Sequence, residues 1–276
     1  MASKIARIIT CINQKGGVSK STTSEALADG LTLKRYRTLL IDLDPQGSVS
    51  LTSGADPTRP TIYEVLIKQC TAHEATQHHT QQVTHEHTQQ VKQKMVRADI
   101  IPASPNLVKI EKELTGIGQE YHLKKQIEQM LEHYDYIIID TPPALGLLTI
   151  NALTASDLVI IPAMADVYSM QGIHQLSYTV EAIKEYTNPE LKLAGILLTR
   201  HNVRSIVSKD MTEDAKDTAD KIETFVYKTV IREGVAVKEA QAQRMSIFEY
   251  APKSNPTTDY RAFVDEFLQK ERVLYG

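Results

Sequence analysis

An apolar run, two glycines and a stretch with helical periodicity follow one another near the beginning of the chain. Residues 5–12 are rich in isoleucine and have no helical period, which is typical of a strand buried on both faces. The run leads to Gly16 and Gly17, and residues 21–34 then carry apolar side chains at roughly helical spacing. A strand, a glycine turn and a helix N-terminus direct backbone N–H groups and a helix dipole at one point, where an anion fits. Residues 13–23 therefore predict a phosphate-binding loop.

Two side chains of this loop suit a nucleotide and its metal ion. Lys20 supplies a mobile positive charge for β- and γ-phosphates, and the Ser21 hydroxyl is a natural Mg²⁺ ligand. The loop departs from the general pattern of such loops, because Gln14 and Ser19 stand where that pattern has glycine. The simpler alternative is a glycine turn beside an exposed pair of lysines.

Two carboxylates follow the next apolar run. Residues 38–42 predict a second buried strand, which runs directly into a turn with Pro45 and Gly47. Open α/β sheets bind ligands at the carboxyl ends of their strands, so Asp42 and Asp44 belong beside the phosphate loop. We expect the turn to expose Asp44, which then orients and polarises the attacking water. Asp42 is expected to support the Mg²⁺ shell or local hydrogen bonds, and the alternative for both is a pair of turn-capping aspartates.

A third signal lies at residues 134–143. Three consecutive isoleucines, residues 137–139, indicate a fully buried parallel strand, and Asp140 follows at its carboxyl end before two prolines. An aspartate in this position holds Mg²⁺ through a water molecule. The alternative is a structural aspartate that ends the strand.

The remaining elements continue the alternation of strands and helices. Strands are predicted over residues 98–103, 157–162 and 191–199, and helices near residues 107–114, 123–133 and 170–186. The repeated β, α, β order predicts an α/β fold with a doubly wound, mostly parallel sheet and helices on both faces.

The closing segment, residues 259–273, predicts an amphipathic helix. Its apolar stripe consists of Tyr260, Phe263, Val264, Phe267 and Leu268, and its polar side carries Asp259, Asp265 and Glu266. An anchor for anionic lipid needs a basic polar face. We therefore expect this helix to pack onto the sheet.

Length and composition are consistent with one large domain over residues 1–276. The formal net charge of −3 means that any nucleic-acid surface must be a local patch. Cys11 and Cys70 form no motif, which favours a reduced, cytosolic protein. No apolar run approaches the roughly 18 residues that a membrane span needs.

A repeat interrupts the alternation at about residues 71–94. Residues 76–83 read TQHHTQQV and residues 84–91 read THEHTQQV, a tandem duplication that carries His78, His79, His85 and His87. Imidazoles suit zinc or copper, so a metal site is one hypothesis. The favoured interpretation is a solvated loop or a lengthened exposed helix, because the segment is rich in Gln and Thr and poor in apolar residues.

The loop as a whole resembles the deviant Walker A box of the ParA/MinD family of ATPases, through Lys15, Gly16, Gly17, Val18, Ser19, Lys20, Ser21 and Thr22. The resemblance implies that these residues bind ATP and that Lys15 reaches across a dimer interface to the partner's nucleotide. Residues 42–48 resemble the family's Walker A′ motif, which assigns the catalytic role to Asp44 alongside the two lysines. Residues 138–143 resemble its Walker B motif. The family usually has glycine where this chain has Ser19, and serine costs about 1 kcal/mol there if the position needs a positive φ.

The last third resembles the carboxyl-terminal portion of Soj-type ParA proteins, in residues 229–240 and 246–254. The basic residues that could touch DNA phosphates are Arg204, Lys209, Arg232 and Lys238, and the resemblance places Arg232 in the region used for nonspecific DNA contact. Thr199 and Arg200 end a predicted strand and, by the resemblance, flank the adenine base. Acidic residues lie between the basic ones, so a solvated charged surface is the alternative.

The resemblance implies an ATP-dependent DNA partition protein. In this hypothesis ATP and Mg²⁺ close a homodimer on nonspecific double-stranded DNA, and slow hydrolysis, stimulated by a ParB-type centromere-binding partner, releases it. Such a protein acts in the cytoplasm on the nucleoid, without stable membrane association, and moves a plasmid or chromosomal origin. The alternative is a MinD-like membrane-cycling ATPase that positions the division site. Iron–sulfur ATPases of this scaffold are disfavoured because Cys11 and Cys70 offer no ligand pair, and tyrosine kinases because Tyr275 stands alone near the end.

Overall fold

A parallel sheet forms the centre of the molecule. The computed structural model describes residues 6–78, 97–201 and 206–275. Within these ranges six strands follow the order β3-β2-β4-β1-β5-β6, and every neighbouring pair is parallel. The strands are β1 (Arg7–Cys11), β2 (Thr38–Asp42), β3 (Asp99–Ile101), β4 (Tyr136–Asp140), β5 (Leu158–Met164) and β6 (Lys192–Thr199). The predicted doubly wound sheet is confirmed, and β2 has the predicted bounds.

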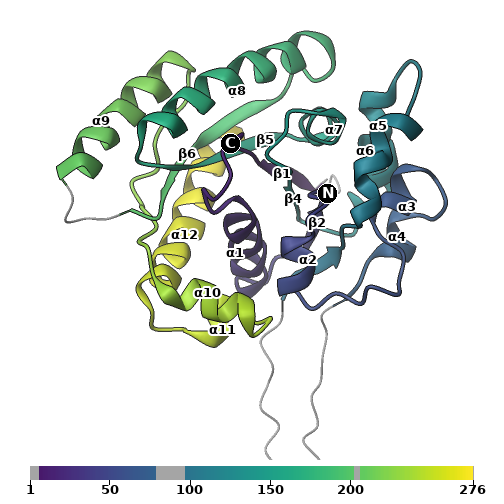
Figure 1. Ribbon diagram of the computed structural model, residues 1–276, viewed down its shortest axis with the longest axis horizontal. Coiled ribbons are helices and arrows are strands. Elements are labelled where there is room, and N and C mark those ends of the chain that lie inside the picture. Colours follow the sequence, from purple (N-terminus) through teal and green to yellow (C-terminus); the bar gives the residue numbers. More distant parts are fainter. Residues whose placement is uncertain (1–5, 79–96, 202–205, 276) are drawn as a thin grey trace, which may run out of the picture.

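Helices cover both faces of this sheet (Figure 1). One face carries α1 (Lys20–Leu33), α2 (Ser48–Thr52), α10 (Val235–Ala242), α11 (Ile247–Tyr250) and α12 (Asn255–Tyr275). On the other face, the half near β2 and β3 carries α3 (Ile62–Leu66), α4 (Ala72–Ala75), α5 (Ile110–Glu113), α6 (His122–Ile127) and α7 (Leu147–Ala155). The half near β5 and β6 carries α8 (Val167–Tyr186) and α9 (Ile206–Lys221).

Two of the predicted helices are shorter than the sequence pattern suggests. The stretch near 107–114 divides into a 3₁₀ turn, η1 (Pro105–Lys109), and α5. The stretch near 123–133 divides into α6 and η3 (Glu128–Met130), after a further turn, η2 (Gln119–Tyr121). Their buried residues still pack against the sheet, so the layers are as predicted.

The closing helix packs onto the sheet as expected. Tyr260, Phe263 and Phe267 of α12 are fully buried in the cluster that contains α1. Gly30 of α1 allows this close approach, because a Cβ there would come within 2.6 Å of Val264 Cγ2. Among the described helices, none is both long and apolar enough to cross a membrane.

The first residues of the predicted repeat insert, 71–78, lie within the described part of the chain. Thr71 and Glu74 form a capping box for α4, and Ala72 and Ala75 are buried against the core. Gln77 then pairs with Ile100 at the edge of the sheet, through backbone N–O distances of 2.7 and 3.0 Å. Residues 71–77 therefore belong to the fold.

Three of the four histidines in the metal hypothesis, His79, His85 and His87, lie outside the described residues. His78 is described, and its Nδ1 lies 2.8 Å from Asp99 Oδ2. Where the structure describes side chains, it brings no three His, Cys, Asp or Glu residues together as a metal site.

Candidate active site

The carboxyl ends of three adjacent strands place the predicted residues at one edge of the sheet. In the strand register Asp140 pairs with Cys11 of β1 on one side and with Asp42 of β2 on the other. The loop that follows β1 therefore starts beside both aspartates, and it leads directly into α1. This is the edge at which α/β sheets bind ligands, as the sequence predicted.

Asn13 fixes the start of the loop between β1 and α1 by hydrogen bonds, and the two glycines of the loop face solvent. Asn13 Oδ1 accepts from Lys15 N at 2.9 Å, and Asn13 Nδ2 donates to Pro162 O at 2.8 Å. Gly16 and Gly17 are exposed, and a Cβ at Gly16 would meet nothing within 4 Å. Backbone N–H groups in such an open turn at a helix N-terminus can bind an anion.

Lys20, the first residue of α1, is buried near the carboxylates of Asp140 and Asp44. Its side chain is buried, with 7% of the residue exposed. Burial lowers the pKa of Lys20, while the negative charges of Asp140 and Asp44 oppose that effect. A cation held in this position is suited to bind phosphate oxygens that enter the loop.

One carboxylate oxygen of Asp140 makes no hydrogen bond. The carboxylate is fully buried, its Oδ1 accepts from Ser24 Oγ at 2.9 Å, and its Oδ2 has no hydrogen-bond partner. Burial raises the pKa of Asp140, and the charge of Asp42 adds to this, whereas hydrogen bonds from Ser21 and Ser24 oppose it. A buried carboxylate oxygen without a partner beside the Ser21 hydroxyl is the oxygen donor set that Mg²⁺ prefers.

Asp42 makes local hydrogen bonds, one of the two roles expected for it. Its Oδ1 accepts from Asp44 N at 3.1 Å, and its Oδ2 accepts from Ser50 N at 2.9 Å and Ser50 Oγ at 2.7 Å. The two bonds from Ser50 anchor the middle of α2 to the end of β2. Asp42 therefore shapes the turn that carries Asp44.

Asp44 is buried, and the expectation that the turn exposes it is wrong. Only 9% of the residue is exposed. Its Oδ1 accepts from Gln46 N at 2.9 Å, and its carboxylate charge acts on Lys20. The turn thus folds Asp44 inward, where its charge acts on Lys20.

Lys15 is bound within its own chain. Its Nζ lies 2.7 and 2.6 Å from the two carboxylate oxygens of Asp166, and 29% of its side chain is exposed. Asp166 also caps α8 by accepting from Ser169 N. Burial raises the pKa of Asp166, but the hydrogen bonds from Lys15 and Ser169 outweigh it and lower the pKa.

Known proteins are similar to this chain over most of its length. The family model of an AAA domain matches residues 6–193. The sporulation initiation inhibitor protein Soj of Bacillus subtilis (strain 168) is 36% identical over 260 residues, which cover 93% of this chain and 96% of that protein. The chromosome partitioning protein ParA of Myxococcus xanthus (strain DK1622) is 34% identical over 270 residues, which cover 97% and 89%. The chain belongs to the ParA/Soj family of partition ATPases.

A similar solved structure contains a nucleotide analogue and magnesium. Cobyrinic acid a,c-diamide synthase from Mycobacterium smegmatis, with bound ATP analog and magnesium, superposes with a TM-score of 0.81 at 31% identity, covering 97% of this chain and 96% of that chain. The donor set of the ParA/Soj chain described above fits both ligands. The fold and the family make the chain an ATP-hydrolysing P-loop enzyme.

Ser19 is the position where this ParA/Soj chain departs from the usual motif, and it adopts φ = 61°. Replacing it with glycine, Ser19→Gly, is expected to raise the free energy of unfolding by about 0.5 kcal/mol, because glycine relieves left-handed strain but loses more chain entropy. Urea denaturation measures the change. Arg35→Gly is the matched control. Arg35 also has a left-handed φ, 71°, but is exposed away from the loop, so the same replacement there should raise the free energy of unfolding to a similar extent. A Ser19→Gly protein less stable than the wild type contradicts the strain account.

Thr199 and Arg200 contact the loop of the ParA/Soj chain from β6. Thr199 Oγ1 donates to Val18 O at 3.0 Å, so its hydroxyl holds the loop. Arg200 Nη1 lies 3.4 Å from Gly17 O, and its Nη2 donates to Glu233 at 2.8 Å. Both residues adjoin the loop, and their predicted contact with adenine stays a prediction.

Of the four predicted DNA-contact residues, the structure describes the side chains of Arg232 and Lys238. Arg232 is engaged by Asp259, with Nε and Nη2 at 2.9 and 2.6 Å from its oxygens. Lys238 is exposed on α10. Lys209 falls in α9, but its side chain, like all of Arg204, lies outside the described residues.

Sequence analysis assigned no role to three residues that support the site. Asn13 holds the loop, Ser24 binds Asp140, and Asp166 binds Lys15. Ser24 lies four residues after Lys20 on a predicted helix, which places both on one face. Asp166 follows the end of β5 closely, so its position at the ligand edge was a usable signal.

Proposed function

We propose that this partition ATPase uses ATP to switch between a free monomer and a DNA-bound homodimer. ATP and Mg²⁺ close two copies face to face, the dimer binds nonspecific double-stranded DNA, and slow hydrolysis releases it. A ParB-type centromere-binding partner stimulates hydrolysis, so that the cargo, a plasmid or chromosomal origin, moves over the nucleoid in the cytoplasm. The observation that carries the proposal is the separation of two lysines, Lys20 buried among carboxylates and Lys15 partly exposed at the rim.

The buried half of the site serves the chain's own nucleotide. Lys20 and the backbone amides of Gly16 and Gly17 bind the phosphates, and Ser21 with Asp140 would hold Mg²⁺, directly or through water. Mg²⁺ supplies charge neutralisation for the phosphate oxygens. Asp44 orients and polarises the attacking water, because it lies inward beside Lys20.

The partly exposed lysine serves a second subunit. Lys15 exchanges its ion pair with Asp166 for the phosphates of the partner's nucleotide. The two contacts compete for one ammonium group, which links nucleotide binding to association. ATP shifts the equilibrium only if it binds the dimer better than the monomer, and this contact provides such a difference.

The variant Lys15→Gln is expected to bind ATP and remain a monomer, because it keeps Lys20 but lacks the charge that reaches the partner. Light scattering after size exclusion measures the mass, with ATP and Mg²⁺ and in an Asp44→Ala background, in which hydrolysis is expected to be slow. Lys253→Gln, which alters an exposed lysine near α12, is the control and should dimerise fully. A Lys15→Gln protein that dimerises like this control contradicts the role of Lys15.

The DNA surface is proposed to include Arg204, Lys209, Arg232 and Lys238. Nonspecific contact with phosphates needs clustered positive charge and no base readout. Arg232 already pairs with Asp259, so it would contribute mainly by presenting its remaining guanidinium N–H groups. No stable membrane association is proposed, because the apolar stripe of α12 is buried in the core.

A further inference from the structure

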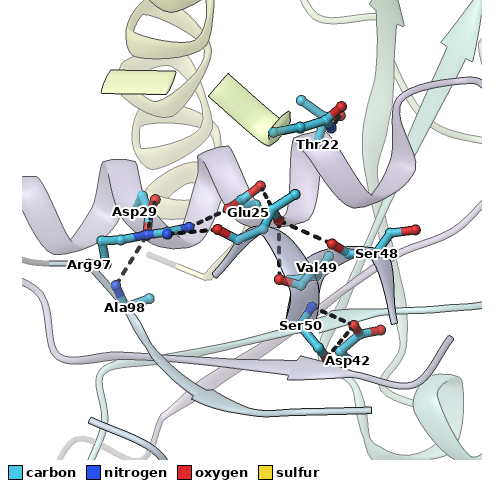
Figure 2. Close-up of polar contacts among 11 residues, drawn as sticks. Thr22, Glu25, Asp29, Asp42, Ser48, Val49, Ser50, Arg97 and Ala98 are labelled. Carbon is cyan, nitrogen blue, oxygen red and sulfur yellow. Dashed lines mark hydrogen bonds and ion pairs between the residues drawn. The ribbon is translucent and has the colours of Figure 1, made fainter. Parts of the chain in front are cut away.

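A buried arginine lies between two acids on the helix that follows the phosphate loop. Arg97, which precedes β3, points toward Glu25 and Asp29 of α1 (Figure 2). Its Nη2 donates to Glu25 Oε1, and its Nε lies 3.3 Å from Asp29 Oδ2. All three side chains are buried. The two acids are four residues apart, so they share one face of α1 and meet the same guanidinium.

The same guanidinium also binds α2. Arg97 Nη1 donates to Thr52 O, the last carbonyl of α2, at 3.0 Å. Thr52 Oγ1 in turn lies 3.1 Å from Glu25 Oε2, within donating distance. Arg97, Glu25 and Thr52 therefore form a closed set of contacts that joins the C-terminus of α2 to α1.

The opposite end of α2 is continuous with the turn that carries Asp44. Gly47 caps α2, and its N–H donates to Asp44 O at 2.8 Å. Ser50, in the middle of α2, binds Asp42 at the end of β2 (Figure 2). Since α2 has only five residues, Thr52 at its end lies five positions from Gly47, the cap that binds Asp44 O.

We propose that Arg97 is a positioning residue for ATP hydrolysis, which through Thr52 and Glu25 locks α2 onto α1 and thereby holds Asp44 over the nucleotide. The inference rests on the catalytic role proposed for Asp44. Arginine suits this task because its planar fork donates in three directions at once, to two acids and a carbonyl. A lysine at this position would keep the positive charge but not the planar set of N–H donors that reaches all three acceptors.

The test compares variants of the full chain in ATP hydrolysis and in ATP affinity. Thr52→Val removes the hydroxyl at nearly constant shape, and with it the contact with Glu25 and the contacts with Ser48 O and Val49 O within α2; Thr52→Ser restores the hydroxyl. Arg97→Lys keeps the charge but loses the fork. Arg59→Lys is the control, because Arg59 is exposed and binds the carbonyl of Thr76 away from the site.

We expect kcat to fall about tenfold in Thr52→Val and Arg97→Lys, the size of loss that a small misplacement of a catalytic group produces. The Kd for ATP, from titration with a fluorescent analogue, should stay within twofold of the wild type. Thr52→Ser and Arg59→Lys should retain wild-type kcat.

If Thr52→Val is folded by circular dichroism and hydrolyses ATP at the wild-type rate, the positioning role is overturned, whether or not Arg97→Lys folds. A loss of stability with unchanged kcat overturns it equally, since a purely structural cluster behaves in that way. Asp44→Ala, measured in parallel, separates the two proposals. Wild-type hydrolysis in Asp44→Ala overturns the catalytic assignment, whereas loss in Asp44→Ala with normal Thr52→Val overturns only the role of Arg97.

Discussion

The variant Lys20→Ala is expected to lose ATP binding, with a Kd raised at least 100-fold, or about 3 kcal/mol. The structure gives the reason, because Lys20 is the buried cation beside Asp140 and Asp44. Without it, the nucleotide phosphates would face two carboxylates with no fixed positive charge between them. Isothermal titration with ATP and Mg²⁺ measures the effect.

The matched control for this prediction is Lys112→Ala, an exposed lysine on α5. It removes the same charge from the chain and should leave the Kd unchanged. If Lys20→Ala binds ATP as tightly as this control, the phosphate-binding role of the loop is wrong.

The variant Asp44→Ala is expected to bind ATP normally and to hydrolyse it about 100-fold to 10,000-fold more slowly, the usual contribution of a positioned general base. The reason is that Asp44 lies inward beside Lys20 but is not among the groups proposed to bind the phosphates. Single-turnover hydrolysis with labelled ATP measures the rate. The ATP-bound dimer should then persist on DNA.

Two further variants separate chemistry from turn geometry. Asp44→Asn keeps an acceptor for Gln46 N–H and should be nearly as inactive as Asp44→Ala. Asp56→Ala removes another turn-capping aspartate, whose Oδ1 accepts from Thr58 N, and should hydrolyse ATP normally. Normal hydrolysis in Asp44→Asn contradicts the catalytic assignment.

The strands, the phosphate loop and the position of Asp140 could be predicted because the sequence patterns that indicate them are local. The isoleucine run before Asp140 and the glycine pair before α1 each combine residues within ten positions of one another. For Ser19 the sequence predicted only the cost of a serine if the position needs a positive φ, and the structure shows that it has one. Local patterns of this kind also defined β2 to the residue.

The polar network around the site could not be predicted, because it joins residues far apart in the chain. Arg97 is 72 positions from Glu25, and Asp166 is 151 positions from Lys15. The inward turn of Asp44 was missed for a related reason. Proline and glycine indicated a turn, but its direction depends on Ser50 and Asp42, which hold α2 in place.

Retention of the wild-type protein on immobilised double-stranded DNA, at several salt concentrations, tests the proposed switch most directly. The account predicts retention with ATP and Mg²⁺, release with ADP or without nucleotide, and a decline with salt whose slope reports the number of phosphate contacts. Equal retention in all three nucleotide states, or no retention with ATP, contradicts it.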